Sequence, residues 1–427
     1  MPDRDTALTS DDNLYLLHPH SVVGRPTPPV VIDRGQGARV WDVEGTAYID
    51  GTCGLWQCAV GHGRAELAAV AAEQMQRLEF YTSFWDFSNE PSIRLAARLV
   101  ELAPAGLGKV FFTNGGSEGT ETAIKLARLA RHATGEPDRT VVLSRTGAYH
   151  GVSGTAMAAT GIERLKDGFG PQAVDFVHLS TPHGPTHGPA ATDKLLVELE
   201  EAIETIGAHR ITAMIGEPVL GVGGSVPPPE GYWPGVQAIL RRHGILLILD
   251  ETITAFGRTG HWFAAERFGV QPDLIITAKA LSSGYVPMGA VLIGDQVIDM
   301  LDGTTFFHGF TYNGHPVGAA VALANLDIIE REGLLQRATV LGDRLLDGLV
   351  PLADLPHVRE VRGCGLMIGI TLESNDAPDV VARCRADGVI ARGAANTIVL
   401  SPPLVITEPE VDTVCEVISR HVRRLGS

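Results

Sequence analysis

Short β-branched runs that alternate with helical patterns constrain the fold of this chain most strongly. From about residue 64 onward, stretches with apolar residues at helical spacing are separated by strand-like runs. These runs cover residues 110–113, 140–143, 211–215, 245–249 and 274–277. Alternation of this kind indicates βαβ units, whose strands form a mostly parallel sheet covered by helices. We therefore expect an α/β fold with a large domain of this type.

The two ends of the chain have a different pattern, with short strands and a long helical stretch at 316–332. The C-terminal helix carries its apolar residues on one face. The short strand-like pieces cover residues 38–42, 47–50, 366–372 and 397–400. These pieces suit a small α+β domain built from both chain ends. We expect the large domain to span 56–319 and the small domain to combine 1–55 with 320–427.

Composition argues against several classes of function. The formal charge of −16 would repel nucleic-acid phosphates and anionic lipid. The apolar runs are too short to span a membrane, and the first residues lack a basic and apolar leader, so we expect a cytoplasmic protein. The five scattered cysteines predict reduced thiols and show no metal-like pairing. We therefore expect no nucleic-acid, membrane or metal partner.

Two of the strand-like runs end in residues that carry chemistry. Asp250 follows 245–249, and a buried carboxylate there needs a cationic or hydrogen-bonding partner, such as a protonated ring nitrogen. The alternative is a carboxylate that caps the next element. Lys279 follows 274–277, where desolvation would lower the pKa of its amine and free it to form a Schiff base. A surface lysine is the alternative, but the glycine-rich stretch at 282–289 indicates close approach to a bulky group.

Two further turns could hold a flat, phosphorylated ligand. Gly115 and Gly116 lead from a strand into a helix, where free backbone amides and the helix dipole suit a phosphate. An ordinary capped helix start is the alternative. Tyr149 follows another strand, and its ring can stack on a flat ligand or simply pack. His150 would suit the base of a hydrolase, but no nucleophile elbow or papain-like cysteine accompanies it.

Spaced motifs along nearly the whole chain agree with one family. These motifs are Gly51-Thr-Cys-Gly-Leu-Trp56, Gly61-His-Gly63, Asn114-Gly-Gly-Ser-Glu118, Tyr149-His-Gly151, Gly216-Glu-Pro-Val219, Gly221 to Gly224, Asp250-Glu251, Phe256-Gly-Arg-Thr-Gly260, Ala278-Lys279, Phe310-Thr-Tyr-Asn-Gly-His-Pro316 and Ser401-Pro-Pro403. With them the chain resembles the fold-type I pyridoxal-phosphate (PLP) enzymes, specifically the class III (omega) aminotransferases. Within that class it is most similar to the amine and beta-alanine:pyruvate group.

The resemblance implies that pyridoxal 5′-phosphate is bound covalently to Lys279 as an internal aldimine. Lys279 would then also move a proton between the substrate carbon and the cofactor. Asp250 would pair with the pyridinium nitrogen and keep it protonated, so that the ring accepts electrons. By the same resemblance Tyr149 stacks on the ring, and Gly116 and Ser117 bind the phosphate.

The resemblance also assigns three residues to the rim of the cofactor. Glu217 would lie near its oxygen side, and Thr252 would face the ring where the family usually has Val or Ile. A hydroxyl there removes no catalytic group but can alter the packing of the ring. Thr311 would reach the phosphate from the neighbouring subunit, which implies a homodimer with shared active sites.

For substrates, the resemblance implies that Trp56 and Phe84 line the donor pocket, although both could be core residues. Arg392 would bind the carboxylate of the acceptor, because a guanidinium pairs bidentately with a planar carboxylate. A surface arginine is the alternative, and the following residues, Gly393 and Ala394, depart from the Pro-Leu-Gly-like turn usual in the family.

The implied reaction is a ping-pong transfer through pyridoxamine phosphate, from an omega-amino acid or primary amine to a keto acid. We expect pyruvate as acceptor, because the stretches 51–56 and 227–233 are more similar to the pyruvate group. The alternative is a 4-aminobutyrate or ornithine type that uses 2-oxoglutarate. An aminomutase or decarboxylase is a further alternative, but the glutamine that decarboxylases carry near Thr252 is absent. A non-catalytic binding protein would not need both Lys279 and Asp250.

Overall fold

The computed structural model describes residues 4–24, 29–181 and 189–426. Its main feature is a seven-stranded sheet with the order β4-β10-β9-β8-β7-β5-β6. The strands are β4 (Leu107–Thr113), β5 (Val141–Arg145), β6 (Phe176–Leu179), β7 (Ile211–Gly216), β8 (Leu246–Asp250), β9 (Leu274–Thr277) and β10 (Gly289–Gly294). Strand β10 runs antiparallel to β4 and β9, and the other pairs are parallel. The predicted α/β fold with a mostly parallel sheet is confirmed.

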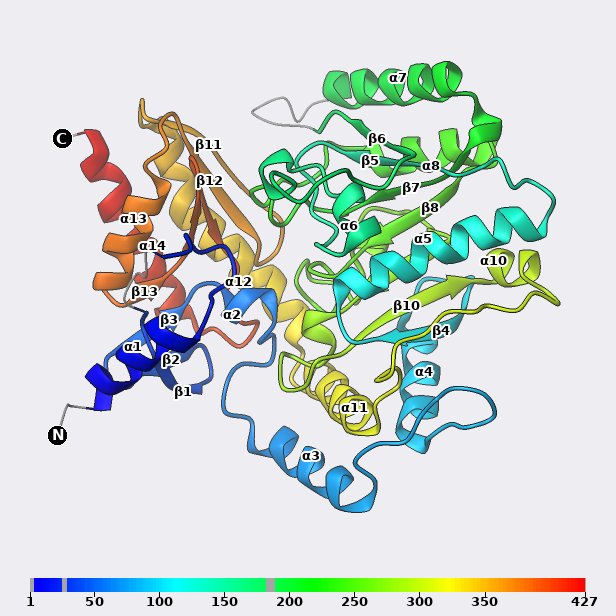
Figure 1. Cartoon of the computed structure of the whole chain (residues 1–427). Helices are drawn as coiled ribbons and strands as arrows, with labels where there is room; N and C mark the ends of the chain where they lie inside the picture. The colour runs from blue at the N-terminus through cyan, green and yellow to red at the C-terminus, as the bar shows by residue number, and fades with distance from the viewer. Residues whose placement is uncertain (1–3, 25–28, 182–188, 427) are drawn as a thin grey trace.

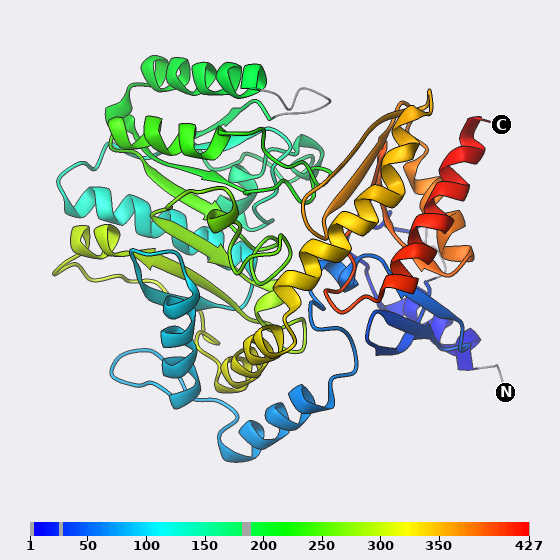
Figure 2. The same ribbon diagram turned by 180° about the vertical axis from the view of Figure 1, so that it is seen from behind.

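Helices cover both faces of this sheet (Figures 1 and 2). The helices of this part of the chain are α3 (Ala65–Arg77), α4 (Glu90–Leu102), α5 (Gly116–Ala133), α6 (Gly154–Ala159), α7 (Pro189–Ile206), α8 (Tyr232–Arg242), α9 (Ala264–Arg267), α10 (Asp295–Met300) and α11 (Pro316–Arg331), of which α3 packs on α11 and not on the sheet. Short 3-10 turns are η1 (Glu163–Leu165), η2 (Ala208–Arg210) and η3 (Lys279–Leu281). The described helices include none that is long and apolar enough to cross a bilayer.

The central strands are apolar throughout because both of their faces are buried. Leu247 and Leu249 of β8 belong to the same core cluster as Val236 of α8. Ile248, which points the other way, lies in the cluster of Ile124 of α5. Successive side chains of a strand point to opposite faces, so a doubly covered strand reads as a continuous apolar run. A continuous apolar run such as 245–249 is therefore the sequence signal that predicts a strand covered on both faces.

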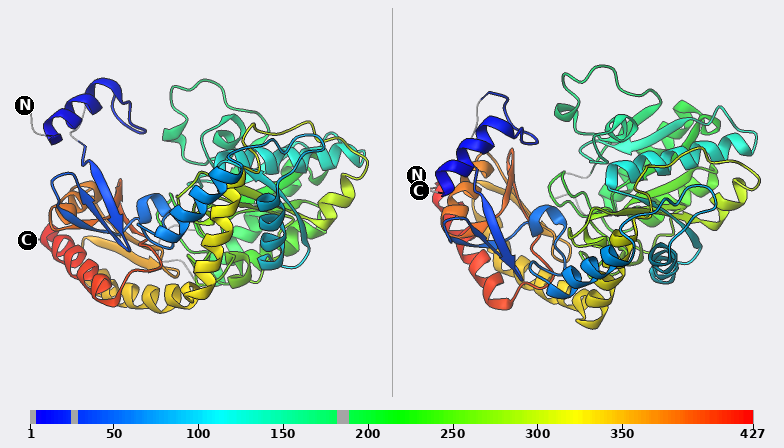
Figure 3. Two further views of the ribbon diagram at one scale, coloured as in Figure 1. Left: turned by 90° about the horizontal axis from the view of Figure 1, so that it is seen from below. Right: turned by 60° about the horizontal axis from the view of Figure 1, so that its bottom comes forward.

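Two smaller sheets form a second lobe beside the large sheet (Figures 1 and 3). The first has the order β1-β2-β3-β13 and the second β11-β12-β15-β14. The strands are β1 (Ile32–Gln36), β2 (Arg39–Asp42), β3 (Ala47–Asp50), β11 (Val358–Gly363), β12 (Ile368–Leu372), β13 (Val389–Ile390), β14 (Arg392–Ala394) and β15 (Thr397–Leu400). Its helices and turns are α1 (Arg4–Tyr15), α2 (Cys53–Trp56), α12 (Leu334–Leu349), η4 (Val350–Asp354), α13 (Ala377–Ala386), α14 (Glu408–Arg423) and η5 (Arg424–Gly426).

Both chain ends contribute to this second lobe. Strand β3 near the N-terminus pairs in parallel with β13, where Ile49 lies opposite Val389. The limits proposed from the sequence, 56–319 against 1–55 with 320–427, stay a prediction, and the limit after residue 319 falls inside α11. Residues 1–3, 25–28, 182–188 and 427 of these proposed domains lie outside the described residues.

The parallel strands bring the candidate residues to one edge of the large sheet. Asp250 ends β8 and pairs with Ile276 of the neighbouring β9, which Lys279 follows two residues after its end. Glu217 follows β7 directly, and the turns after β4 and β5 reach the same edge. In an open α/β sheet, ligands bind beyond the carboxyl ends of the strands.

Candidate active site

A cavity of about 310 Å³ opens at this edge of the sheet. It is lined by Gln57, Asn114, Gly115, Gly116, Ser117, Tyr149, His150, Gly151, Glu217, Asp250, Thr252, Ile253, Ala278, Lys279, Ser282, Gly284, Val286, Pro287 and Met288. Seven of the residues predicted from the sequence are therefore brought together, namely Gly116, Ser117, Tyr149, Glu217, Asp250, Thr252 and Lys279.

Lys279 begins the turn η3 two residues after the end of β9 and has a positive φ of 44°. Its surroundings lower the pKa of the amine to about 8, mainly because burial disfavours the charged form. The negative charges of Asp250 and Glu217 oppose this shift, and the positive charge of Arg392 adds to it. The free, nucleophilic amine is therefore far more populated near neutral pH than in an ordinary lysine.

Asp250 is buried and forms a short contact with an equally buried histidine. His150 Nδ1 lies 2.8 Å from Asp250 Oδ2, and the backbone N–H of Thr252 donates to Oδ1 over 3.1 Å. Burial raises the pKa of Asp250, but these hydrogen bonds outweigh it, so the pKa lies below its usual value. An ionised carboxylate thus faces the cavity, where it would stabilise a positive charge on a ligand.

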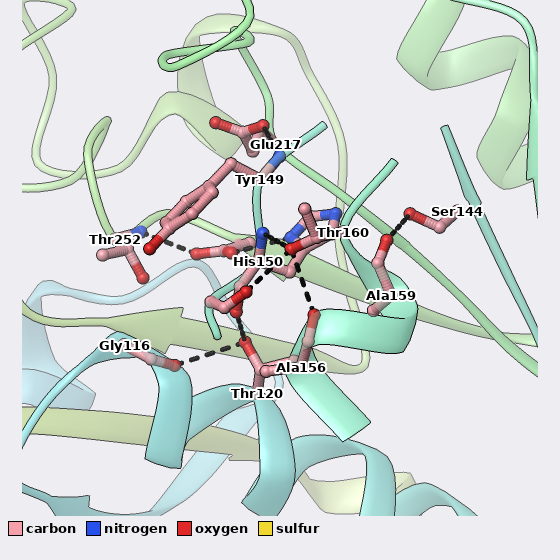
Figure 4. Close-up of polar contacts among 12 residues, drawn as sticks. Gly116, Thr120, Ser144, Tyr149, His150, Ala156, Ala159, Thr160, Glu217 and Thr252 are labelled. Carbon is pink, nitrogen blue, oxygen red and sulfur yellow. Dashed lines mark hydrogen bonds and ion pairs between the residues drawn. The ribbon is translucent and has the colours of Figure 1, made fainter. Parts of the chain in front are cut away.

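His150 is itself fixed by two threonines (Figure 4). Its backbone N–H donates to Thr160 Oγ1 over 2.9 Å, and its carbonyl accepts from Thr120 Oγ1 over 2.8 Å. With Asp250 ionised, the Nδ1 atom must carry the hydrogen of their contact. The opposite ring atom, Nε2, is buried and has no hydrogen-bond partner within residues 4–24, 29–181 and 189–426. The sequence pattern indicated His150 only as a possible hydrolase base and did not predict its pairing with Asp250.

Tyr149 projects its ring between Glu217 and Thr252 (Figure 4). The carboxylate of Glu217 accepts hydrogen bonds from the backbone N–H groups of Tyr149 (3.0 Å) and Gly221 (2.9 Å). Burial raises the pKa of Glu217, and burial together with nearby Asp250 raises that of Tyr149. Thr252 Oγ1 is buried and has no hydrogen-bond partner among the residues for which the structure gives positions.

The start of α5 forms the other end of the cavity. Gly115 and Gly116 precede Ser117 there, and a side chain at Gly115 would point into open space. Ser117 Oγ accepts from the backbone N–H of Val152 over 3.2 Å. A Cβ at Gly151 would lie 2.4 Å from Ser117 Oγ, so only glycine allows this close approach. The free N–H groups of a long helix start suit an anion.

A second cavity of about 350 Å³ lies beside the first and contains Trp56 and Arg392. The Arg392 guanidinium lies 4.9 Å from the centre of the Trp56 ring, and Lys279 Nζ lies 5.4 Å from the same ring. Arg392 Nη1 and Trp56 Nε1 are both buried, and neither has a hydrogen-bond partner in the described parts of the chain. The Trp56 ring therefore lies close to both the lysine of the first cavity and the arginine of the second.

Phe84 and Thr311 line neither cavity. Phe84 packs against Gly309, where an added Cβ would lie 2.5 Å from the phenyl ring. Ser83 Oγ donates to the carbonyl of Asn313 over 2.9 Å, so the segments that carry Phe84 and Thr311 lie together. Thr311 is exposed. Their predicted roles in the pocket stay predictions.

The residues of the first cavity fit PLP. Its amine, Lys279, is partly uncharged, and Asp250 offers a buried negative charge for a protonated ring nitrogen. The glycine-lined start of α5 has open space for a phosphate, and Thr252 Oγ1 is left without a partner inside the cavity. A volume of about 310 Å³ accommodates a small aromatic ligand.

Comparisons with known proteins agree with this geometry. The family model for Aminotransferase class-III matches residues 21–422. A chloroplastic gamma-aminobutyrate transaminase of Solanum lycopersicum is 38% identical over 90% of this chain and 78% of its own length. The putrescine–pyruvate aminotransferase of Pseudomonas aeruginosa is 36% identical over 90% of this chain and 88% of its own. An (S)-enantioselective omega-transaminase of Thermomicrobium roseum superposes with a TM-score of 0.96, at 44% identity over 99% of both chains.

The family model matches far more than half of the chain. The Thermomicrobium roseum structure covers both lobes. The protein is an enzyme, and the chain belongs to the class III aminotransferases.

Proposed function

We propose that this enzyme moves an amino group from an omega-amino acid or primary amine to pyruvate in two half-reactions. The observation that carries the proposal is the pairing of a partly uncharged amine, Lys279, with a buried carboxylate, Asp250, in one cavity. Asp250 would hold a cationic ring, and Lys279 would react with a carbonyl. These are the two groups that amine transfer with PLP requires of a protein.

The site would hold PLP through residues at both ends of the cavity. Gly116 and Ser117 would bind the phosphate, Tyr149 would stack on the ring, and Asp250 would accept a hydrogen bond from the ring nitrogen. When bound, PLP supplies a carbonyl that condenses with amines and a ring that accepts electrons. Glu217 and Thr252 would bound the ring on its remaining sides.

Lys279 would act as the proton carrier as well as the attachment point. Displaced by the substrate amine, its Nζ would accept the proton from the carbon that bears the amino group. A pKa of about 8 suits this role, because the amine is readily protonated and deprotonated near neutral pH. His150 would hold Asp250 ionised and oriented throughout.

Arg392 would bind the carboxylate of the keto acid. Among the residues that the structure describes, its buried Nη1 has no hydrogen-bond partner, and its guanidinium lies over the Trp56 ring without an ion pair to an acidic residue. A guanidinium that is kept free of protein carboxylates is available to a substrate carboxylate. Trp56 would form the wall against which the amine donor packs.

We infer that the enzyme acts as a homodimer. Large aromatic side chains around Phe84 and Thr311 are exposed, with Trp85 at 83% and Phe307 at 94%. Exposed apolar groups gathered on one face are typical of protein interfaces. A second subunit on this face would bury them and could bring Phe84 and Thr311 to its cavity. The cytoplasmic location stays a prediction.

The 2-oxoglutarate branch is the second candidate function. The tomato gamma-aminobutyrate transaminase supports it, whereas the Pseudomonas aeruginosa putrescine–pyruvate enzyme and the Thermomicrobium roseum omega-transaminase support the main proposal. The structural relative has the highest identity of these and covers nearly the whole chain.

A visible absorbance titration of the PLP-loaded protein tests the proposal. Beta-alanine, 4-aminobutyrate, putrescine and 1-phenylethylamine are added singly without acceptor, and the yellow band is followed. We expect at least one donor to remove the band and pyruvate to restore it. The control is Lys279→Ala, in which no donor should cause this cycle.

Recovery with 2-oxoglutarate but not with pyruvate would replace the main proposal by the second candidate. A wild-type protein that binds no PLP and shows no yellow band would overturn the proposed function altogether.

A further inference from the structure

Arg258 is a buried cation without a carboxylate partner. It lies in the loop between β8 and α9 and is 1% exposed. Over the ranges 4–24, 29–181 and 189–426, no acidic group forms an ion pair with it. A buried guanidinium in such a place costs more free energy than an apolar side chain of similar size. The burial of Arg258 without an acidic partner therefore indicates a role other than stabilising the fold.

The guanidinium donates to three neutral acceptors from three separate segments. Nη1 lies 2.5 Å from the carbonyl oxygen of Pro402 and 3.3 Å from that of Leu366. Nη2 lies 3.2 Å from Cys53 Sγ. The backbone carbonyl of Arg258 also accepts from the N–H of Leu366 over 3.1 Å. One side chain of the large lobe thus ties together three segments of the small lobe.

Two of these segments form walls of the second cavity. Cys53 begins the turn that ends in Trp56, and Pro402 follows Ser401; Trp56 and Ser401 both line this cavity. The same loop starts at Asp250, the carboxylate of the first cavity. Arg258 therefore links the loop that begins at Asp250, in the first cavity, to the segments that line the second cavity.

The turn that Arg258 contacts has a strained backbone. Cys53, Gly54 and Trp56 have φ values of 55°, 68° and 60°. Residues other than glycine rarely adopt this left-handed backbone conformation, and contacts with the surrounding structure must hold them in it. Asp50 fixes one side of the turn, accepting from the N–H groups of Thr52 (3.0 Å) and Gly54 (2.7 Å). Arg258 donates a hydrogen bond to the thiol of Cys53, the residue between Thr52 and Gly54.

We propose that Arg258 is a positioning residue that sets the specificity for the amine donor. It holds the turn at Cys53 so that the Trp56 ring stays next to Lys279 and Arg392, with the ring centre 5.4 and 4.9 Å from their charged groups. The position of this ring then determines how large a donor side chain can fit. This inference rests on the proposed function, because it assigns Trp56 to the donor pocket.

The first test is the variant Arg258→Lys, which keeps the charge but cannot reach three acceptors at once. The ratio of kcat/KM for 1-phenylethylamine to that for isopropylamine is measured with pyruvate as acceptor. We expect the ratio to rise by about tenfold in favour of the bulky amine, since a methylene-sized change in a pocket has effects of this order. PLP absorbance per protein should not change.

Arg362→Lys is the matched control. Arg362 is also a buried arginine that joins the lobes, donating to the carbonyl of Gly224 over 2.6 Å, but it lines neither cavity. Its replacement should leave the ratio at the wild-type value. If Arg258→Lys lowers kcat/KM for both amines by the same factor, or if both variants shift the ratio alike, the proposal is overturned.

The second readout does not depend on activity. Iodoacetamide labelling, mapped by peptide mass spectrometry, should modify Cys53 in Arg258→Lys but not in the wild type, where this thiol is fully buried. Cys384 in α13 is equally buried and serves as the internal control. Labelling of both thiols would indicate general loosening and contradict a local role, as would labelling of neither.

Cys53→Ala provides a second variant in case Arg258→Lys does not fold. It removes one acceptor of the guanidinium, so the amine ratio should shift in the same direction by a smaller factor; an unchanged ratio would count against the proposal. If the wild type reacts with no amine, the proposed function fails. The labelling of Cys53 still decides whether Arg258 holds the turn.

Discussion

The two halves of the active site are built differently. Lys279 and Asp250 follow neighbouring parallel strands of one doubly covered sheet, and their positions depend on a rigid core. Trp56 and Arg392 come instead from a strained turn and from β14 in the small lobe. The residues proposed to bind the cofactor are therefore positioned by the large sheet. The residues proposed to contact the substrate depend on how the small lobe is attached to the large one.

The largest effect is expected at the sheet edge. Lys279→Ala should reduce turnover by about three orders of magnitude or more, because one amine supplies both the attachment and the proton transfer. The rate of amino transfer to pyruvate measures this. Recovery of part of the rate by added methylamine would sharpen the assignment, and a variant with substantial unaided turnover would contradict it.

Asp250→Asn should reduce turnover by about a hundredfold, since a buried charge that stabilises the reacting ring is lost. The same change should move the titration of Lys279 in the apoprotein. The charge of Asp250 raises the pKa of Lys279, so its removal should lower that pKa below about 8. Reductive methylation of Lys279 would then reach half its maximal rate at a lower pH. An upward displacement would show that the two side chains do not interact as described.

Arg392→Met tests the other half of the site and should have a smaller, selective effect. Loss of a charge-assisted contact should raise KM for pyruvate by about tenfold to a hundredfold. The half-reaction with isopropylamine, which has no carboxylate, should keep its rate. Equal losses in both half-reactions would indicate that Arg392 supports the pocket wall rather than the carboxylate.

The smallest effect is expected at Thr252, where the hydroxyl is buried without a partner. Thr252→Val removes this unsatisfied group and should increase the free energy of unfolding of the apoprotein by about 1 kcal/mol. Thermal unfolding of apoprotein measures this, and turnover should change little. A large loss of turnover would instead mean that the hydroxyl contacts the bound cofactor.

The pattern of apolar residues was sufficient to predict strands that are covered by helices on both faces. The run at 245–249 is continuous and apolar, and it forms β8 within one residue of the predicted limits. Strands β6 and β10 were not predicted. Strand β6 has four residues at the edge of the sheet, and β10 begins and ends with glycine, which is typical of turns.

The contacts within the site were less accessible from the sequence. The strand ends indicated Lys279 and Asp250, but no local pattern shows that His150 pairs with Asp250, because this contact depends on how β5 and β8 are placed in the sheet. The same holds for Arg258, whose motif was recognised without its acceptors. Such contacts between distant segments follow from packing.

Borohydride reduction of the yellow, PLP-loaded protein tests the central claim most directly, because reduction fixes the cofactor permanently to its amine. Peptide mass spectrometry then identifies the modified residue. The account predicts one pyridoxyl-phosphate group per chain, located on the peptide that contains Lys279. Modification of another lysine, or of none while the protein still transfers amino groups, would contradict it.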